Sequence, residues 1–418
     1  MKAIKRNVPQ YPLSLHQELI LRIETLVQTG SGLGRIELDN SSDESFQSNR
    51  KWVVLVPFTI PGERVRVRIH RNHANYSEAV LLEVLEPSEY RRVPKCKLFT
   101  QCGGCQLQHM IYDEQLRFKK EAVAEVLARK AGVLCNEIQV FGSPIEFGYR
   151  SKITPHFQKP RNCSIGNIGF LRHGHRSEIV DVEQCLIARD EINAILPSIR
   201  EMVKANAVKY KKGATLLLRV DDVGVHTHPQ EICRQRVGEL EFLFPAGAFF
   251  QNNACILPQF TEYVTRVASS SGANRLLDVY CGCGVFGLCA AKHFIEVIGI
   301  EIDPESRYWA EENAKRNNIT NARFISGQAE KIFTQVTCEA NHTVVILDPP
   351  RAGCSRCFLE QLIRFSPKAI VYVSCHPATQ ARDIQQLLSA GYCVKEVAVF
   401  DLFPQTYHVE SVVTLVKK

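Results

Sequence analysis

The second half of this 418-residue chain alternates short apolar segments with stretches of helical character. Over residues 247–418 the alternation is regular, which is the pattern of a doubly wound α/β domain with a largely parallel sheet. The last two apolar segments follow each other without a helical stretch, so we expect the sheet to finish in a hairpin. In chain order the candidate strands are RLLDVY, EVIGIEI, ARFIS, TVVILD, AIVYVS, VKEVAVFDLF and VESVVTLV.

The rest of the chain predicts two further domains, in keeping with a length that exceeds one ordinary hydrophobic core. Residues 18–88 alternate short β-type runs with glycine and proline turns, which indicates a small antiparallel barrel of a kind that often binds oligonucleotides. Residues 89–246 are irregular, with one expected helix at 113–131. We therefore predict a multi-domain α/β chain.

Composition and charge narrow the class of protein. The hydrophobic fraction of 45% and the charged fraction of 23% are those of a globular chain. The start of the sequence does not read as an apolar leader, and no apolar run is long enough to cross a bilayer. We therefore expect a cytoplasmic protein with no membrane partner. The net charge of +7 is modest, but basic residues gather near tyrosines at 64–73, 90–97 and 209–213, which favours a phosphate backbone as partner.

The first candidate strand of the α/β domain runs into a glycine-rich turn. Gly282, Gly284 and Gly287 have the spacing G-x-G-x-x-G, where glycine lets the backbone approach a ligand closely. The next strand ends in Glu301, whose carboxylate can accept hydrogen bonds from ribose hydroxyls. These features suit either a nicotinamide dinucleotide or S-adenosylmethionine. Asp348 ends a later strand before two prolines, which fits a pocket for a flat base better than a hydride-transfer site.

A cysteine follows the fifth candidate strand at the same expected edge of the sheet. Cys375 lies between Ser374 and a His-Pro turn, and the carboxyl ends of parallel strands form the ligand edge of such a sheet. We interpret Cys375 as a candidate nucleophile and Glu410, at the start of the last strand, as its candidate general base. Because an ordinary thiol is only slightly ionised near neutral pH, the site must favour the thiolate or remove the proton when substrate binds.

Four of the sixteen cysteines form a candidate metal site. Cys96, Cys102 and Cys105 have the spacing C-x5-C-x2-C, and Cys185 follows much later. In a long chain without a secretory leader, cysteines read as thiols, metal ligands or catalysts. Four thiolates hold zinc or an iron-sulfur cluster, and the spacing alone does not decide between them.

Taken in order, the motifs FFQNN, LLDVYCGCG, GIEIDP, ILDPPRAG, VYVSCHPATQARD and DLFPQTYHVES resemble those of the uracil-5 RNA methyltransferases. The resemblance covers nearly the whole chain and is to the TRAM-domain, iron-sulfur branch that acts on 23S ribosomal RNA. It implies an OB-like TRAM β-barrel, a central α+β iron-sulfur domain and a C-terminal Rossmann-like methyltransferase domain. Two positions depart from the family pattern, since Val285 and His376 stand where asparagine is frequent.

The resemblance also implies roles for particular residues. Cys375 would be the nucleophile and Glu410 the proton acceptor, and the four cysteines would hold a 4Fe-4S cluster. The thiolate would add to carbon 6 of uracil, the resulting enolate would attack the methyl group from carbon 5, and the base would remove the carbon 5 proton so that cysteine is eliminated. The family's positions for binding S-adenosylmethionine fall on Gln251, Tyr280, Glu301 and Asp348.

RNA is the expected partner, with 23S ribosomal RNA favoured, because the related tRNA enzymes are expected to lack the barrel and the cysteine quartet. Three alternatives remain: a tRNA uracil-5 methyltransferase, a non-catalytic iron-sulfur protein that binds RNA or the ribosome, and a nicotinamide-dependent dehydrogenase. Intact Cys375 and Glu410 speak against the second, and only the glycine turn supports the third. No obligate protein partner is predicted. A flipped-out uridine would stack on Phe249, Phe250 or Tyr407.

Overall fold

The computed structural model describes residues 11–38, 51–135, 137–327 and 338–417. The chain forms two compact units. The first takes the chain up to Thr100 together with Cys105–Gln115 and Gln405–Tyr407, and the second takes Gln101–Gly104, Leu116–Pro404 and His408–Lys418. The division into domains at 18–88, 89–246 and 247–418 stays a prediction.

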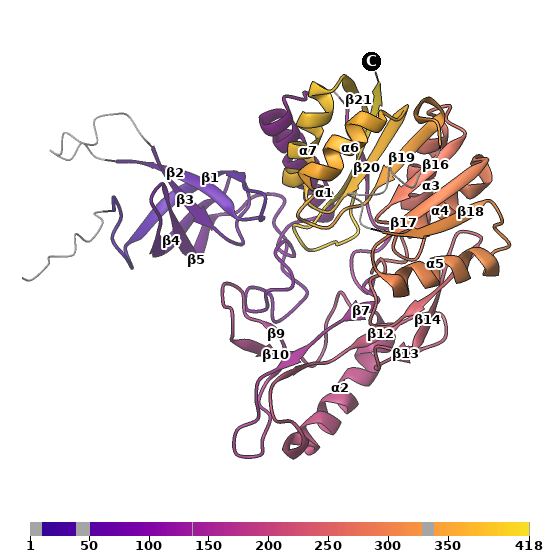
Figure 1. The fold of residues 1–418 in the computed structure, drawn as a ribbon. Helices are drawn as coiled ribbons and strands as arrows, with labels where there is room; N and C mark the ends of the chain where they lie inside the picture. The colour runs from indigo at the N-terminus through magenta and orange to yellow at the C-terminus, as the bar shows by residue number, and fades with distance from the viewer. Residues whose placement is uncertain (1–10, 39–50, 136, 328–337, 418) are drawn as a thin grey trace, which may run out of the picture. The chain divides into compact units, whose positions relative to one another are not determined.

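The first unit contains a closed five-stranded barrel with strand order β1-β2-β3-β5-β4 (Figure 1). Its strands are β1 (Glu18–Leu26), β2 (Gly32–Glu37), β3 (Lys51–Val56), β4 (Arg64–Asn72) and β5 (Tyr76–Glu86). The predicted barrel is confirmed, but the expectation of a wholly antiparallel one is wrong at one pair. Strands β3 and β5 are parallel, because β4 lies between them in sequence and runs antiparallel to β5.

Successive residues of β4 point alternately into the barrel and to its outer side. Val65, Val67 and Ile69 are buried in the barrel core, and the basic residues between them lie on the outer side. Gly32 on β2 is closely packed, and a Cβ atom there would lie 2.1 Å from Thr59 Oγ1, so this strand position requires glycine. The barrel therefore keeps an apolar interior beneath a basic outer strand.

An eight-stranded sheet forms the centre of the second unit, with strand order β18-β17-β16-β19-β20-β22-β21-β6 (Figure 1). The pairs from β18 to β20 are parallel, and β22 pairs antiparallel with both β20 and β21. The predicted parallel sheet with a terminal hairpin is confirmed. The strands are β6 (Gln139–Phe141), β16 (Arg275–Val279), β17 (Glu296–Glu301), β18 (Ala322–Ser326), β19 (Thr343–Leu347), β20 (Ala369–Ser374), β21 (Tyr392–Phe400) and β22 (Glu410–Lys417).

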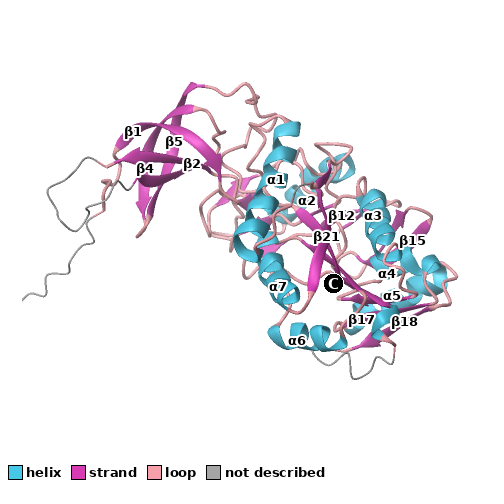
Figure 2. Cartoon of the chain, turned by 90° about the horizontal axis from the view of Figure 1, so that it is seen from above, coloured by secondary structure: helices cyan, strands magenta, loops and turns pink. Residues whose placement is uncertain are grey.

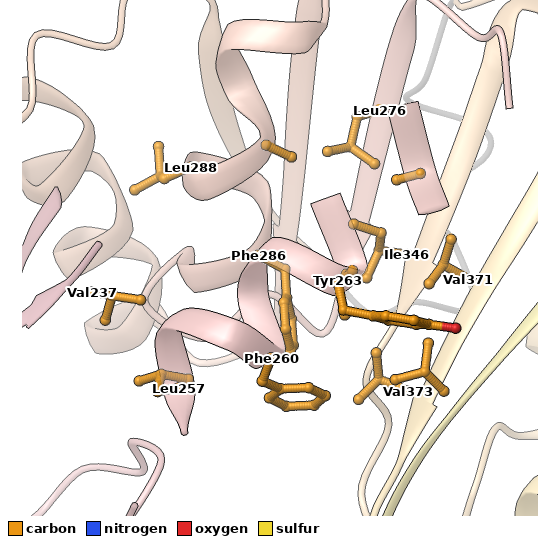
Figure 3. Close-up of a cluster of buried hydrophobic side chains, with 14 of the residues drawn as sticks. Val237, Leu257, Phe260, Tyr263, Leu276, Phe286, Leu288, Ile346, Val371 and Val373 are labelled. Carbon is orange, nitrogen blue, oxygen red and sulfur yellow. The ribbon is translucent and has the colours of Figure 1, made fainter. Parts of the chain in front are cut away.

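Helices cover both faces of this sheet (Figure 2). On one face α3, α4 and α5 share a core with Leu276 and Ile346, shown in Figure 3. On the other face α1, α6 and α7 share a core with Leu277 and Val345. Because successive strand residues alternate between two apolar cores, each strand reads as a continuous apolar run. The helices are α1 (Tyr112–Val126), α3 (Leu257–Ser269), α4 (Val285–Ala290), α5 (Pro304–Arg316), α6 (Arg356–Phe365) and α7 (Pro377–Ser389).

The segment that precedes the predicted α/β domain contributes to the same sheet. The helix expected at 113–131 is confirmed as α1 followed by a π-helical turn, Leu127–Ala131. Val123 and Val126 pack in the core that contains Leu277, and β6 pairs with β21 at the sheet edge. Sequence periodicity did not reveal this short edge strand.

The remaining residues of the segment 89–246 form small sheets and one long helix. A four-stranded sheet has the order β10-β9-β8-β11, a three-stranded sheet has the order β13-β12-β7, and β14 pairs with β15. Within the described ranges, no helix is both long enough and apolar enough to span a membrane. The elements are β7 (Lys152–Ile153), β8 (His156–Phe157), β9 (Ile168–Leu171), β10 (Ile179–Asp181), α2 (Asp190–Ala205), β11 (Ala214–Thr215), β12 (Leu218–Val220), β13 (Val225–His226), β14 (Ile232–Val237) and β15 (Leu240–Pro245).

Candidate active site

The carboxyl edge of the large sheet collects five of the residues that the sequence singled out. Tyr280 follows β16, Glu301 ends β17, Asp348 follows β19 and Cys375 follows β20. Glu410 reaches the same edge from the other direction, because it is the first residue of the antiparallel strand β22. Strand direction therefore explains why a residue 35 positions after the cysteine belongs to the same site.

A buried hydrogen-bond network fixes the junction between β20 and β22. Ser374 pairs with Ser411 in the strand register, one residue from Cys375 and from Glu410 respectively. Gln380 on α7 accepts a hydrogen bond from Ser411 Oγ at 2.7 Å and donates one to the Tyr372 carbonyl at 2.8 Å. The network leaves little freedom at the two residues that carry the expected chemistry.

The candidate base affects the ionisation of the candidate nucleophile, and burial affects both. Burial, together with the carboxylates of Glu410 and Asp348, raises the pKa of the Cys375 thiol to about 11. Burial likewise raises the pKa of Glu410 well above its ordinary value, with Asp348 adding to the effect. At neutral pH such a thiol is mainly protonated. Of the two expectations for activation, these surroundings favour removal of the thiol proton when substrate binds.

Arg351 also lies at this site, and sequence reasoning did not single it out. Its guanidinium interacts with Cys375 and lowers the pKa values of Cys375 and Glu410, against the effect of burial. Its Nη2 lies 3.3 Å from Nδ1 of His408, whose pKa burial and then Arg351 lower to about 4, so this imidazole is neutral. The signal was present in the motif DPPRAG, where an arginine follows the two prolines at the ligand edge.

The loop that carries Arg351 is clamped to α7, the helix that follows the nucleophile. Asp383 accepts a hydrogen bond from Tyr372 Oη at 2.6 Å and another from the Cys354 backbone N–H at 2.8 Å. Gly353 has a φ of +77°, and a Cβ atom there would lie 2.6 Å from Asp383 Oδ2. The clamp therefore ties the Asp-Pro-Pro loop and the nucleophile to one helix.

His376 departs from the family pattern but keeps a structural task. Its Nδ1 accepts a hydrogen bond from the Thr379 backbone N–H at 3.3 Å and so caps α7, as the side chain of asparagine does at a helix start. The proline at Pro377 then begins the helix. Histidine at this position therefore preserves the turn that presents Cys375.

The glycine turn after β16 has the geometry of a ligand-binding loop. Gly282 and Gly284 have φ values of +54° and +87°, which favour glycine, and a Cβ atom at Gly282 would meet no atom within 4 Å. Gly287 is needed for a different reason, since its Cβ atom would lie 2.8 Å from Asp278 Oδ2. The turn is open on one side and closely packed against β16 on the other.

Two carboxylates line this turn. Glu301 accepts backbone hydrogen bonds from Gly282 and Asp303, each at 2.9 Å, and its oxygens retain lone pairs for ribose hydroxyls. Asp278 accepts one from the Gly287 N–H at 2.7 Å, while its buried Oδ1 has no partner among the described residues. Burial raises the pKa of Asp278 to about 7. The orphan oxygen and the open turn fit a ligand with ammonium and ribose groups, which S-adenosylmethionine has.

Three other residues were predicted to contact a ligand, Gln251 the cofactor and Phe249 and Phe250 the flipped-out base. Gln251 is half-buried in the loop between β15 and α3, and its role stays a prediction. Phe250 is not available for base stacking, because it is 3% exposed and its ring stacks on Phe244 with centroids 4.0 Å apart. Phe249 is 76% exposed, so it remains a candidate for stacking on a base.

The cysteine quartet is divided between the two units. Cys96 and Cys105 belong to the first unit, and Cys102 and Cys185 belong to the second. Each is half-buried. The backbone at Cys185 is held by Asn193, which accepts from its N–H at 2.9 Å and donates to its carbonyl at 3.0 Å. The assignment of a cluster to these residues stays a prediction.

Comparisons with known proteins agree with this geometry. The family model for tRNA (uracil-5-)-methyltransferases matches residues 232–418, and the TRAM domain model matches residues 16–82. A tRNA (uracil(54)-C(5))-methyltransferase of Schizosaccharomyces pombe is 42% identical over 100% of this chain and 81% of its own length. The Saccharomyces cerevisiae protein of the same name is 34% identical over 96% and 74%.

A solved structure extends the likeness to the fold. The Pyrococcus abyssi tRNA (uracil-54, C5)-methyltransferase in complex with S-adenosyl-L-homocysteine has a TM-score of 0.70 and 25% identity, covering 95% of this chain and 100% of that one. The sheet, its glycine turn and its acidic carboxyl edge define a Rossmann-like methyltransferase. The chain belongs to the tRNA (uracil-5-)-methyltransferase family, and its activity is S-adenosylmethionine-dependent methylation of uracil carbon 5 in RNA.

The preference for 23S ribosomal RNA loses its support. It assumed that the tRNA enzymes lack the N-terminal barrel, but relatives named as tRNA methyltransferases align with 100% and 96% of this chain, the barrel residues included. The comparisons therefore favour the alternative substrate, tRNA, over the one that the sequence motifs suggested.

Proposed function

We propose that this protein methylates carbon 5 of uridine 54 in tRNA. The observation that carries the proposal is the identity of 42% with a tRNA (uracil(54)-C(5))-methyltransferase over the full length of the chain. A match of this extent includes the barrel and the central segment, which are the parts of the chain available to recognise an RNA, as well as the catalytic sheet.

In the proposed reaction Cys375 and Glu410 act on the same base in sequence. The Cys375 thiolate adds to carbon 6, and the electron pair of the 5,6 double bond moves to form an enolate. Bound S-adenosylmethionine would supply an electrophilic methyl group to carbon 5 of the enolate, with cleavage of the sulfur–methyl bond and release of S-adenosylhomocysteine. Glu410 then removes the proton from carbon 5, the double bond re-forms and Cys375 leaves as a thiolate.

Arg351 is proposed to stabilise the negative charge in this sequence. It is the cation that lowers the pKa values of both Cys375 and Glu410, so it favours the thiolate before addition and the carboxylate before proton removal. His408 beside it is neutral, so the positive charge of this pair lies on Arg351 alone. The cofactor would be held by Glu301, Asp278 and the Gly282 turn, with Gln251, Tyr280 and Asp348 as the further contacts that the family resemblance implies.

The cysteine quartet is proposed to hold a 4Fe-4S cluster. The donor set supports this, because four cysteine thiolates are the ligands that such clusters take. With four protein ligands the cluster has no open position, so its expected task is to brace the chain around Cys96 to Cys105 and Cys185. A cytoplasmic location likewise stays a prediction.

The test is transfer of labelled methyl from S-adenosylmethionine to unmodified RNA by anaerobically purified protein. The substrates are a tRNA transcript, the same transcript with cytidine at position 54, and 23S ribosomal RNA. We expect label only in the first, and a stalled covalent adduct between protein and RNA in the Glu410→Gln variant. Label in ribosomal RNA but not in tRNA would overturn the substrate, and label in neither would favour the non-catalytic alternative.

A further inference from the structure

A second cluster of metal-binding side chains lies away from the sheet edge, on the small strands β12 to β14 (Figure 1). Asp221 follows β12, His226 ends β13 and Cys233 is the second residue of β14. One ligand atom from each lies within 4.8 Å of the other two. Asp221 and Cys233 are buried, and His226 has a side-chain exposure of 16%.

The backbone and a neighbouring carboxylate orient these side chains toward one another. Asp221 Oδ1 accepts hydrogen bonds from the backbone N–H groups of Val223 and Gly224, and Oδ2 accepts from that of Arg234. His226 Nε2 lies 3.0 Å from Asp221 Oδ2, yet it is buried without a well-formed hydrogen bond. On the other side of the ring, Nδ1 lies 3.6 Å from Glu231 Oε2. A carboxylate behind a histidine is the arrangement that orients this ring toward a metal.

We propose that Asp221, His226 and Cys233 bind a zinc ion. One sulfur, one nitrogen and one oxygen ligand form a set that zinc accepts, with a fourth tetrahedral position left for water. The assignment does not depend on the proposed function, because the cluster lies on strands outside the catalytic sheet.

The charges around the cluster are consistent with a metal-bound thiolate. Arg219 is 2% exposed and forms no ion pair with a carboxylate in the described part of the chain. Its guanidinium donates to the Ala248 carbonyl at 3.0 Å, and the thiols of Cys233 and Cys283 are its electrostatic neighbours. A buried cation is costly without a negative partner, and a zinc-bound thiolate at Cys233 supplies one.

The proposed zinc would stiffen the segment that leads to the methyltransferase sheet. The backbone N–H of Ala246 donates to the Glu231 carbonyl at 2.7 Å, and that of Gly247 donates to Pro229 at 2.8 Å. Lys152 Nζ donates to the Gly247 carbonyl at 2.9 Å. The chain from β13 to β14 is thus bonded to residues 246–247, which lie just before Gln251, so loss of zinc should loosen this loop.

Metal content is the first measurement, on full-length protein whose iron-sulfur cluster has been reconstituted anaerobically, because an empty cysteine quartet would itself take zinc. After incubation with zinc chloride and dialysis, the wild type should retain one zinc per chain beyond the iron. Cys233→Ser should lose that zinc, and Cys393→Ser, which changes a half-buried cysteine on β21, should keep it. Glu231→Gln should weaken zinc binding about 10-fold, as loss of an orienting carboxylate does.

A spectroscopic measurement on the wild type covers the case in which Cys233→Ser does not fold. Cobalt in place of zinc should give a thiolate-to-cobalt charge-transfer band, which His226→Gln weakens. The proposal fails if the cluster-loaded wild type retains no zinc, or if folded Cys233→Ser retains as much as the wild type. If the protein binds no zinc but transfers methyl to tRNA, only the zinc proposal fails. If it binds zinc but transfers no methyl to tRNA, only the proposed tRNA activity fails.

Discussion

The carboxyl edge of the large sheet and the outer face of the barrel use charged residues in opposite ways. At the edge, Asp278 and Glu410 are buried, and burial raises their pKa values. On the barrel, Arg66 lies between Glu18 and Glu83 with 43% of its side chain exposed. At the edge, a few buried charged groups interact strongly with one another. On the barrel, many exposed charged groups interact only weakly, because solvent screens their charges. Substitutions should therefore have large effects in the first region and small ones in the second.

The largest effect is expected for Cys375→Ser, which keeps the size of the side chain but replaces the thiol by a far weaker nucleophile. Methyl transfer should fall by about 10⁴-fold or more, the scale on which loss of a covalent nucleophile acts. Cys393→Ser is the matched control, and its rate should stay within a factor of two of the wild type. The measurement is single-turnover transfer of labelled methyl to tRNA. A Cys375→Ser rate within tenfold of the wild type would remove the covalent mechanism.

A smaller loss is expected when the clamp beneath the Arg351 loop is weakened. Asp383 Oδ2 accepts from Tyr372 and from the Cys354 N–H, and Oδ1 accepts from Arg382, so in Asp383→Asn one set of these donors must face an NH2 group. We expect a stability loss of about 1–3 kcal/mol, as for a buried hydrogen bond left unmade. Displacement of Arg351 should lower kcat by roughly 10²-fold at temperatures where the variant is folded.

The control for the clamp is Arg356→Ala, which removes an exposed pair with Glu360 on α6. Its kcat should be unchanged and its stability should move by less than about 0.5 kcal/mol. If folded Asp383→Asn has the kcat of the wild type, the clamp serves stability alone and does not position Arg351.

The glycine turn gives a further test of how closely the edge is packed. In Gly287→Ala the new methyl would lie 2.8 Å from Asp278 Oδ2 and 3.2 Å from Val297 Cγ1, so we expect about 1–3 kcal/mol of overpacking and weaker binding of S-adenosylhomocysteine. Gly327→Ala is the control, because a Cβ atom there meets nothing within 4 Å. Calorimetric titration and thermal unfolding measure both effects. Equal behaviour of the two variants would contradict the close packing.

Much of the sheet edge could be predicted from the sequence, and the reasons are local. Strand ends are visible as apolar runs that stop at Glu301, Asp348 and Cys375, and parallel topology brings such ends together. Glu410 could be placed because the terminal hairpin has no helix between its strands. The role of Arg351 could not, because it depends on the positions of Cys375 and His408 in space.

The parts that sequence reasoning missed depend on long-range contacts. Strand β6 has three residues, too few to show a period, and it pairs with β21, which lies more than 250 positions later. The barrel motif could be recognised, but its parallel β3–β5 pair follows from barrel closure and leaves no mark in composition. The preference for ribosomal RNA had another cause, because barrel and quartet were taken as marks of a ribosomal substrate, whereas relatives named as tRNA methyltransferases align along the barrel as well.

The pH dependence of stability tests the burial of Glu410. Its pKa is raised in the folded chain, so the folded state favours the protonated carboxyl. The sign follows: this contribution is complete below the unfolded pKa of about 4.5 and is lost as pH rises toward the folded value. Glu410→Gln keeps a neutral side chain at every pH. The variant should therefore gain stability relative to the wild type as pH rises from 5 to 8, and a constant difference in urea unfolding would show that Glu410 titrates normally.

The smallest effect is expected on the barrel face, where Arg68 and Arg66 form a matched pair on β4. Arg68 is exposed and has no ion pair among the described residues, whereas Arg66 already pairs with Glu18 and Glu83. If this face meets the tRNA backbone, Arg68→Ala should weaken tRNA binding roughly two- to fivefold and reduce the salt slope by about 1, while kcat stays constant. Arg66→Ala should have less effect, because its charge is already compensated. Equal losses from both would mean that the face acts through its net charge, and no loss from either would place tRNA binding on other basic residues, such as those at 209–213.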